Sequence, residues 1–161
     1  MKVLVSGLRK QSKIDEVRNS LEFFASRLMT KRLSKTLTIK VQFLEELEGG
    51  YAGTCESLVD GVRPKKFGIQ LKRSLPRSKL LRTLAHEMVH VKQYARGELD
   101  QYVRNNGKVR WKDRYYAYDS EVDFRTMADE YWDSPWEIDA YGREEGLYKR
   151  YLKHLKLCTA P

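Results

Sequence analysis

The pattern that most constrains this chain is His86-Glu87-Met88-Val89-His90, which stands inside a segment of helical period. Apolar residues recur every three or four positions from Leu80 to Ala95, and Gly97 is placed to end a helix. Side chains four positions apart lie one turn apart on the same helix face, so His86 and His90 can bind one metal ion through their ring nitrogens. We therefore predict a metal-binding helix over residues 77–96.

Glu87 projects beside the two histidines and is too close to them in sequence to be a comfortable third ligand. A carboxylate at this position can instead take a proton from a water molecule that the metal activates. The pattern thus supplies two ligands and a general base.

A catalytic zinc ion normally has three protein ligands and one open position. Glu137, in the segment Pro135-Trp136-Glu137-Ile138-Asp139-Ala140-Tyr141, is a candidate for the third, whereas His154 reads as an exposed helix histidine. Glu137 also lies three residues after Ser134, where it can close a capping box, and acidic side chains favour the first turn of any helix. The sequence alone does not decide whether Glu137 is a metal ligand or a helix cap. Four acidic neighbours are also candidates for the third ligand: Asp133, Asp139, Glu144 and Glu145.

The two segments together, His86 to Gln93 and Pro135 to Tyr141, resemble the gluzincin-type zinc metallopeptidases, including small predicted peptidases of bacteria and phages. The resemblance covers the chain from a strand predicted at 66–72 to a helix predicted over 134–157. It implies Zn²⁺ held by His86, His90 and Glu137, with Glu87 as general base. It also implies hydrolysis of peptide bonds in an intracellular protein substrate.

Two related patterns are not met. SprT-like proteases are similar in size, basic charge and H-E-x-x-H motif, but they use a third histidine soon after the motif, and none lies between His90 and His154. The metzincin continuation is also missing, because Gln93, Arg96 and Asp100 stand where its residues would be.

Tyr94 and Tyr141 are candidates for stabilising the oxyanion of the reaction, each one turn beyond a predicted ligand. The chain has ten tyrosines, so a core or surface role is the more common one for any of them. Asp139 is a candidate acceptor for a histidine N–H.

The predicted fold is a single α+β, zincin-like domain over residues 1–161. We expect a helix over 13–33, a sheet over 36–72, the metal-binding helix, and a helix over 134–157 that carries the third ligand. Within the sheet we expect strands at 36–44, 53–59 and 66–72, with a hairpin at Asp60-Gly61. Because Pro64 precedes it, the last of these is predicted to be a basic edge strand, able to receive an acidic substrate segment near Gly68–Leu71. A second hairpin is expected around Asn105-Asn106-Gly107, and a short helix over 120–132.

The 161 residues carry 31 basic and 22 acidic side chains, a net charge of +9. Eight basic and no acidic residues lie between Gly61 and His86, and Arg–Tyr interleaving over 102–118 resembles a surface that binds nucleic acid. A basic nucleic-acid-associated protein is therefore the alternative, either a SprT-like protease acting on DNA-bound proteins or a non-catalytic module. An inactive peptidase homologue that only binds protein is a third reading.

Several classes of protein or site are disfavoured. Acidic residues at 119, 121, 123 and 130 have calcium-loop spacing, but Phe124 stands where that loop needs glycine. Cys55 and Cys158 are expected as free thiols. With no signal peptide and no apolar run long enough to span a membrane, we expect a cytoplasmic protein.

Overall fold

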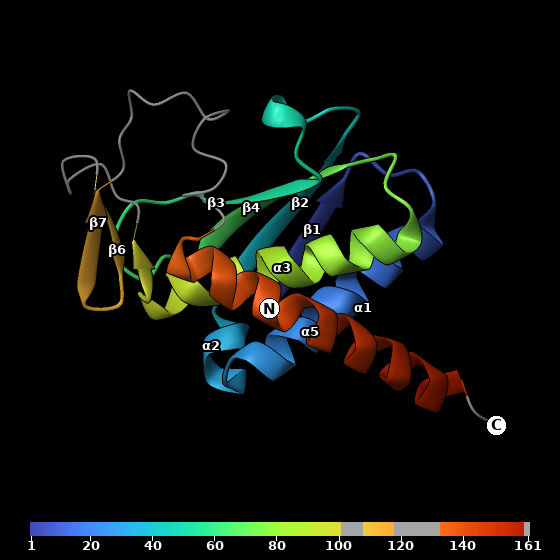
Figure 1. Ribbon diagram of the computed structural model, residues 1–161. Helices are drawn as coiled ribbons and strands as arrows, with labels where there is room; N and C mark the ends of the chain where they lie inside the picture. The colour runs from blue at the N-terminus through green and yellow to red at the C-terminus, as the bar shows by residue number, and fades with distance from the viewer. Residues whose placement is uncertain (101–107, 118–132, 160–161) are drawn as a thin grey trace.

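The computed structural model describes residues 1–100, 108–117 and 133–159 and confirms a mixed α+β fold (Figure 1). Its first part contains β1 (Lys2–Ser6), α1 (Gln11–Leu28), α2 (Lys31–Lys35), β2 (Thr38–Leu44), the short 3₁₀ turn η1 (Glu48–Gly50), β3 (Gly53–Ser57) and β4 (Lys66–Lys72). It continues with α3 (Arg77–Arg96), β5 (Leu99–Asp100), β6 (Lys108–Trp111), β7 (Arg114–Ala117) and α5 (Pro135–Thr159).

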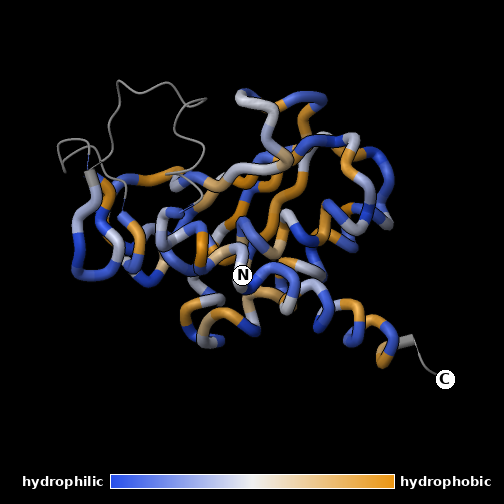
Figure 2. Tube along the Cα trace, in the orientation of Figure 1, coloured by the Kyte–Doolittle hydropathy of each residue, from blue (hydrophilic) through white to orange (hydrophobic). Residues whose placement is uncertain are grey.

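A four-stranded sheet in the order β1-β2-β4-β3 forms the back of the domain. The first three strands are parallel, and β3 runs antiparallel to β4 at the edge. Strand β2 alternates as predicted, with Ile39, Val41 and Phe43 buried on one face, and Leu37 just before it is buried too. Helices α1 and α3 cover that face and α5 packs along α3 (Figure 1), so apolar residues gather along the central strands (Figure 2).

The predicted basic edge strand is wrong. Strand β4 lies between β2 and β3, and the edge beside α3 is β3, whose one charged residue is Glu56. Pro64 lies two residues before β4 begins, so its missing N–H removes no hydrogen bond from the ladder. The proline therefore marks the approach to an inner strand.

The helix predicted over 13–33 is two helices. Helix α1 ends at Leu28, and Thr30 starts α2 by accepting a hydrogen bond from the Leu33 N–H at 3.3 Å. Strand β1 was not predicted, because it is short and half-buried and gives little periodicity.

The helix that carries the motif has the predicted bounds, Arg77–Arg96. Gly97 ends it in a left-handed conformation, φ 70°, and donates to the carbonyls of Gln93 and Tyr94. The last predicted helix is confirmed as α5, which extends to Thr159.

A second sheet of β5, β6 and β7 stands beside the C-terminal end of α3. The hairpin tip at Asn105-Asn106-Gly107, the helix at 120–132 and the acidic segment at 119–130 lie outside the described residues. Cys55 and Cys158 are free thiols, as predicted. Among the described residues, no helix combines the length and apolar character needed to cross a membrane.

Candidate metal centre

Helices α3 and α5 bring the three predicted ligands together. The Nε2 atoms of His86 and His90 are 3.1 Å apart, and the two oxygens of Glu137 lie 3.2 Å from His86 Nε2 and 3.3 Å from His90 Nε2. All three residues are buried, with exposed fractions of 8%, 7% and 3%. The small, fully buried Ala140 lies one turn from Glu137 on α5, where it lets the two helices approach closely.

These separations match the geometry of a small divalent ion. A tetrahedron with metal–ligand bonds of about 2.0–2.1 Å has edges of about 3.3–3.4 Å, close to the observed nitrogen–nitrogen and nitrogen–oxygen distances. Two imidazoles and one carboxylate are also a donor set found in catalytic zinc sites. The three residues thus form a group that could hold a metal ion.

The electrostatics of the centre favour a positive charge. Burial alone would lower the pKa of His86, but the carboxylates of Glu137 and Glu144 outweigh it and raise the pKa to about 9. Burial would raise the pKa of Glu137, but the two imidazoles lower it to about 2. The pKa of His90 is also raised, because Glu137 opposes the effect of burial. The carboxylates thus favour positive charge at this position, which a divalent cation would also supply.

The second ring nitrogen of each histidine faces a polar side chain, and that of His90 is hydrogen-bonded. Glu144 Oε2 lies 3.2 Å from His86 Nδ1, and Gln93 Oε1 lies 2.9 Å from His90 Nδ1. With Nδ1 of His90 as the donor to Gln93, the Nε2 lone pair of that ring is available to a metal ion.

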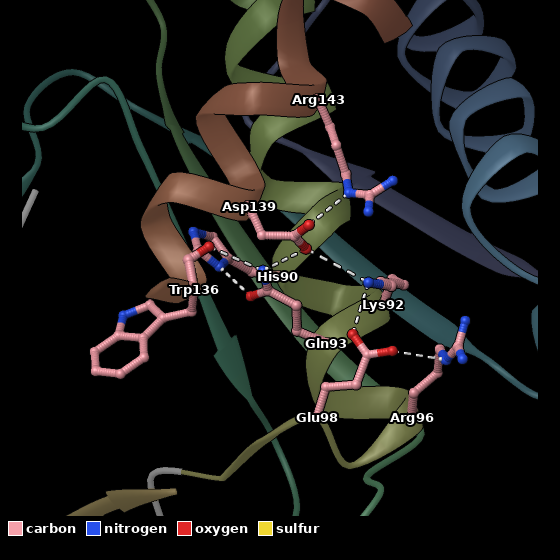
Figure 3. A network of polar contacts seen from close by, with 8 residues as sticks. All are labelled: His90, Lys92, Gln93, Arg96, Glu98, Trp136, Asp139 and Arg143. Carbon is pink, nitrogen blue, oxygen red and sulfur yellow. Dashed lines mark hydrogen bonds and ion pairs between the residues drawn. The ribbon is translucent and has the colours of Figure 1, made fainter. Parts of the chain in front are cut away.

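Gln93 connects the histidine to α5 (Figure 3). Its amide nitrogen donates to the Trp136 carbonyl at 2.9 Å and to Asp139 Oδ2 at 3.2 Å. The sequence suggested Asp139 itself as an acceptor for a histidine N–H. In the described contacts Asp139 instead reaches His90 through Gln93.

A chain of charged side chains extends this connection along the same side of α3 (Figure 3). Asp139 pairs with Arg143 at 2.7 Å and with the buried Lys92 at 3.4 Å. Lys92 also pairs with Glu98 at 2.6 Å, and Glu98 with Arg96 at 2.9 Å. The chain ties the C-terminal end of α3 to the helix that carries the third ligand.

Glu87 lines the same cleft as the three ligands, a hollow of about 740 Å³ between α3, α5 and β3. It is 4% exposed, and burial raises the pKa of its carboxyl against the opposing effect of the two histidines. Strand β3 approaches closely here, because a Cβ on Gly53 would lie 2.5 Å from Thr83 Cγ2 and 3.1 Å from Glu87 Oε1. A raised pKa and a place beside the ligands suit a group that accepts a proton and then returns it.

Tyr94 and Tyr141 both line the cleft. The Tyr141 ring is centred 4.4 Å from the His86 ring and is 43% exposed, whereas Tyr94 is 8% exposed and lies beside Phe67. Burial raises the pKa of both phenols, so each keeps its proton and can donate a hydrogen bond. Tyr141 is thus the more accessible of the two predicted donors.

Comparison with protein-family models, curated proteins and solved structures finds no match. The interpretation of this centre therefore depends on its residues and their geometry.

His154 stands apart from the centre. It is exposed on the C-terminal half of α5, where its ring stacks on Phe23 with centroids 5.0 Å apart. Gln93 had no predicted role and Glu144 was named only as a competitor of Glu137. Their spacing could have indicated these roles. Gln93 lies three residues after His90 and Glu144 lies seven after Glu137, so each shares a helix face with a proposed ligand.

The basic run between Gly61 and His86 offers less free charge than its composition suggests. Four of its eight basic residues form ion pairs with carboxylates elsewhere in the domain: Lys72 with Glu46, Arg73 with Glu45, Arg77 with Glu16, and Arg82 with Glu145. The run is therefore not a uniform cationic face.

Proposed function

We propose that this protein is a zinc-dependent metallopeptidase that hydrolyses peptide bonds of a protein substrate. The observation that carries the proposal is the meeting of His86 Nε2, His90 Nε2 and the Glu137 carboxylate at 3.1–3.3 Å, with Glu87 beside them in an open cleft. A structural zinc site would be closed and rich in cysteine, and it would give Glu87 no role.

A zinc ion at His86, His90 and Glu137 would supply Lewis-acid activation of water and of the substrate carbonyl. Glu87 accepts a proton from the attacking water while the water oxygen bonds to the carbonyl carbon. As the carbon–nitrogen bond breaks, Glu87 returns that proton to the leaving amine. Tyr141, which lines the cleft beside His86, would donate a hydrogen bond to the oxygen that becomes negative.

Strand β3 offers a way to position an extended substrate. Within the described residues it pairs with β4 alone, so backbone groups on its other side remain for an added strand. We predicted such docking at Gly68–Leu71, but those residues are in the inner strand β4. We therefore propose that β3 pairs with the substrate strand instead. Its first residue, Gly53, lies against Glu87.

Metal content is the first test. Purified protein should hold one zinc ion per chain after mild dialysis, and Glu137→Ala should lose it. His154→Ala is the matched control, because it removes an exposed histidine from the same helix without touching the centre. Zinc retained by Glu137→Ala, or absent from the wild type after zinc is supplied, would contradict the proposed centre.

Cleavage is the second test. The zinc-loaded wild type should cut peptides that Glu87→Gln leaves intact, while Glu87→Gln should still bind zinc, because Glu87 is a base and not a ligand. Equal cleavage by both proteins would show that the activity comes from a contaminant.

Binding to nucleic acid stays a prediction from the net charge of +9. A SprT-like protease acting on DNA-bound proteins would combine both readings, and a non-catalytic module would bind nucleic acid without cleaving peptides. Binding that weakens steeply with added salt would support a nucleic-acid partner.

A further inference from the structure

We infer that Lys79 makes the cleft selective for a carboxylate on the substrate, two or three residues after the bond that is cleaved. The inference deepens the proposed peptidase function and rests on it. Three observations carry it: the place of Lys79 in the cleft, the direction of β3, and the charges of the other residues that line the cleft.

Lys79 lies on the face of α3 that forms the floor of the cleft. Thr83, Glu87, His90 and Tyr94 follow it at helical spacing, and all of these line the hollow. Lys79 is exposed, and it takes part in none of the ion pairs among the described residues. Its ammonium group is thus available to a ligand in the cleft.

Strand β3 runs in the same direction as α3. Gly53, where β3 begins, lies against Thr83 and Glu87, in the middle of the helix. At the other end of β3, Ser57 pairs with Phe67, whose ring is centred 6.4 Å from the ring of Tyr94, two turns after Glu87 on α3. Beyond the hairpin, Lys65 donates to the carbonyl of Ala95 at 3.0 Å, near the end of α3.

This direction orients the substrate. Antiparallel pairing is slightly more stable than parallel pairing, so an added strand would run against β3 and therefore against α3. Its residues after the cleaved bond would then lie toward Lys79, and its residues before that bond toward Tyr94.

The distance from Lys79 to His86 determines which residue of the substrate Lys79 can contact. Lys79 and His86 are seven residues apart, which is about 10 Å along a helix. An extended peptide covers that distance in about three residues, and a lysine side chain can reach back by one more. The position is therefore the second or third residue after the cleaved bond.

The other charged residues of the cleft leave Lys79 as the group that attracts a substrate carboxylate. Among the described residues that line the cleft, Lys79 is the one lysine or arginine, and Glu87, Glu137 and Glu144 lie together around the metal centre. A substrate carboxylate would be repelled by those glutamates and attracted by Lys79. Either an acidic side chain or the terminal carboxylate of the substrate would satisfy it, since both present the same group.

A peptide library read by mass spectrometry tests the inference. Cuts made by the zinc-loaded wild type and absent with Glu87→Gln should show a roughly two- to fivefold enrichment of Asp, Glu or chain ends at that position, the size that an exposed ion pair supports. Lys79→Glu should remove this enrichment or reverse it toward Lys and Arg. Lys31→Glu, the same charge change at an exposed position on α2, should keep it.

The outcomes separate the inference from the function on which it rests. No difference between wild type and Glu87→Gln would overturn both. Cuts without an acidic preference, or with one that Lys79→Glu leaves unchanged, would overturn the inference alone. Enrichment at internal acidic residues and enrichment at chain ends distinguish the two sources of the carboxylate.

A binding measurement gives a readout independent of turnover. A fluorescent peptide taken from the cuts should bind Glu87→Gln two- to fivefold more tightly with Glu than with Gln at the selected position. That difference should shrink at 1 M salt and be absent when Lys79→Glu is added. Equal binding of the two peptides would overturn the inference.

Discussion

The side-chain oxygen of Gln93 lies 2.9 Å from Nδ1 of His90, and its amide nitrogen donates to the Trp136 carbonyl on the facing helix. One buried amide thus sets the orientation of a proposed ligand and joins α3 to α5. The candidate metal centre is thus supported by a side chain outside the proposed ligand set.

Replacing Gln93 should weaken metal binding more than it weakens the fold. Loss of a group that orients a metal-binding histidine typically lowers metal affinity about 10- to 100-fold. We expect a decrease of this size for Gln93→Ala, measured by competition with a zinc chelator. Gln93→Glu can still accept from His90 and should recover part of the affinity. Unchanged affinity in Gln93→Ala would show that Gln93 has a packing role only.

Glu144 should contribute in the same way through His86. Its oxygen lies 3.2 Å from His86 Nδ1, so Glu144→Ala should reduce zinc affinity, and Glu144→Gln, which keeps an acceptor, should reduce it less. Glu145→Gln is the matched control, because Glu145 pairs with Arg82 and does not contact the centre in the described structure. An equal effect at both positions would point to net charge as the cause.

Gly53 should tolerate no side chain. A Cβ there would lie 2.5 Å from Thr83 Cγ2, so Gly53→Ala must push β3 away from α3, and we expect a loss of about 1–3 kcal/mol in the free energy of unfolding. It should also lower cleavage, because Glu87 lies at the same contact. Urea denaturation measures the first effect and peptide turnover the second.

Gly146 is the opposite case and serves as the control. It lies in α5, and a Cβ added there would meet no heavy atom of a neighbouring element within 4 Å, so Gly146→Ala should stabilise the protein by about 0.5–1 kcal/mol. A destabilising effect at Gly146 would contradict the described course of α5.

Zinc binding should release protons. Glu137 and Glu144 raise the pKa of His86 to about 9, so at pH 7 this imidazole is protonated and must lose its proton to bind a metal ion. We expect at least one proton released per zinc ion at pH 7, measured by calorimetry in buffers of different ionisation enthalpy. The apparent affinity should rise with pH until about pH 9. Proton release that is absent at pH 7 would contradict the raised pKa.

Local sequence signals predicted the elements whose causes are local. Helix α3 was predicted with its bounds because an apolar stripe and a terminal glycine define it. Helix α1 was predicted too long, since apolar spacing continues past Leu28 although Thr30 caps a new helix. The position of β4 depends on which strands pair with it, and neither Pro64 nor the hairpin at Asp60-Gly61 determines that pairing.

The same distinction holds in the centre. His86, Glu87 and His90 are fixed relative to one another by one helix, so the sequence predicts their relation. Glu137 comes from a second helix, and its spacing from Ser134 suits a cap as well as a ligand, so the packing of α5 on α3 was needed to place its carboxylate. Glu144 and Gln93 become recognisable only after that packing is known.

The distance in sequence between the ligands has its own consequence. His86 and Glu137 are 51 residues apart, so an ion bound by both would act as a removable cross-link that closes a long loop. A permanent cross-link across a loop of this length would restrict the unfolded chain by about 4 kcal/mol in the chain-entropy description. Chelation would therefore loosen the attachment of α5 first, and amide hydrogen exchange would rise there before it rises in the central strands. Metal supply would then control how firmly the last helix is held as well as whether the centre can act.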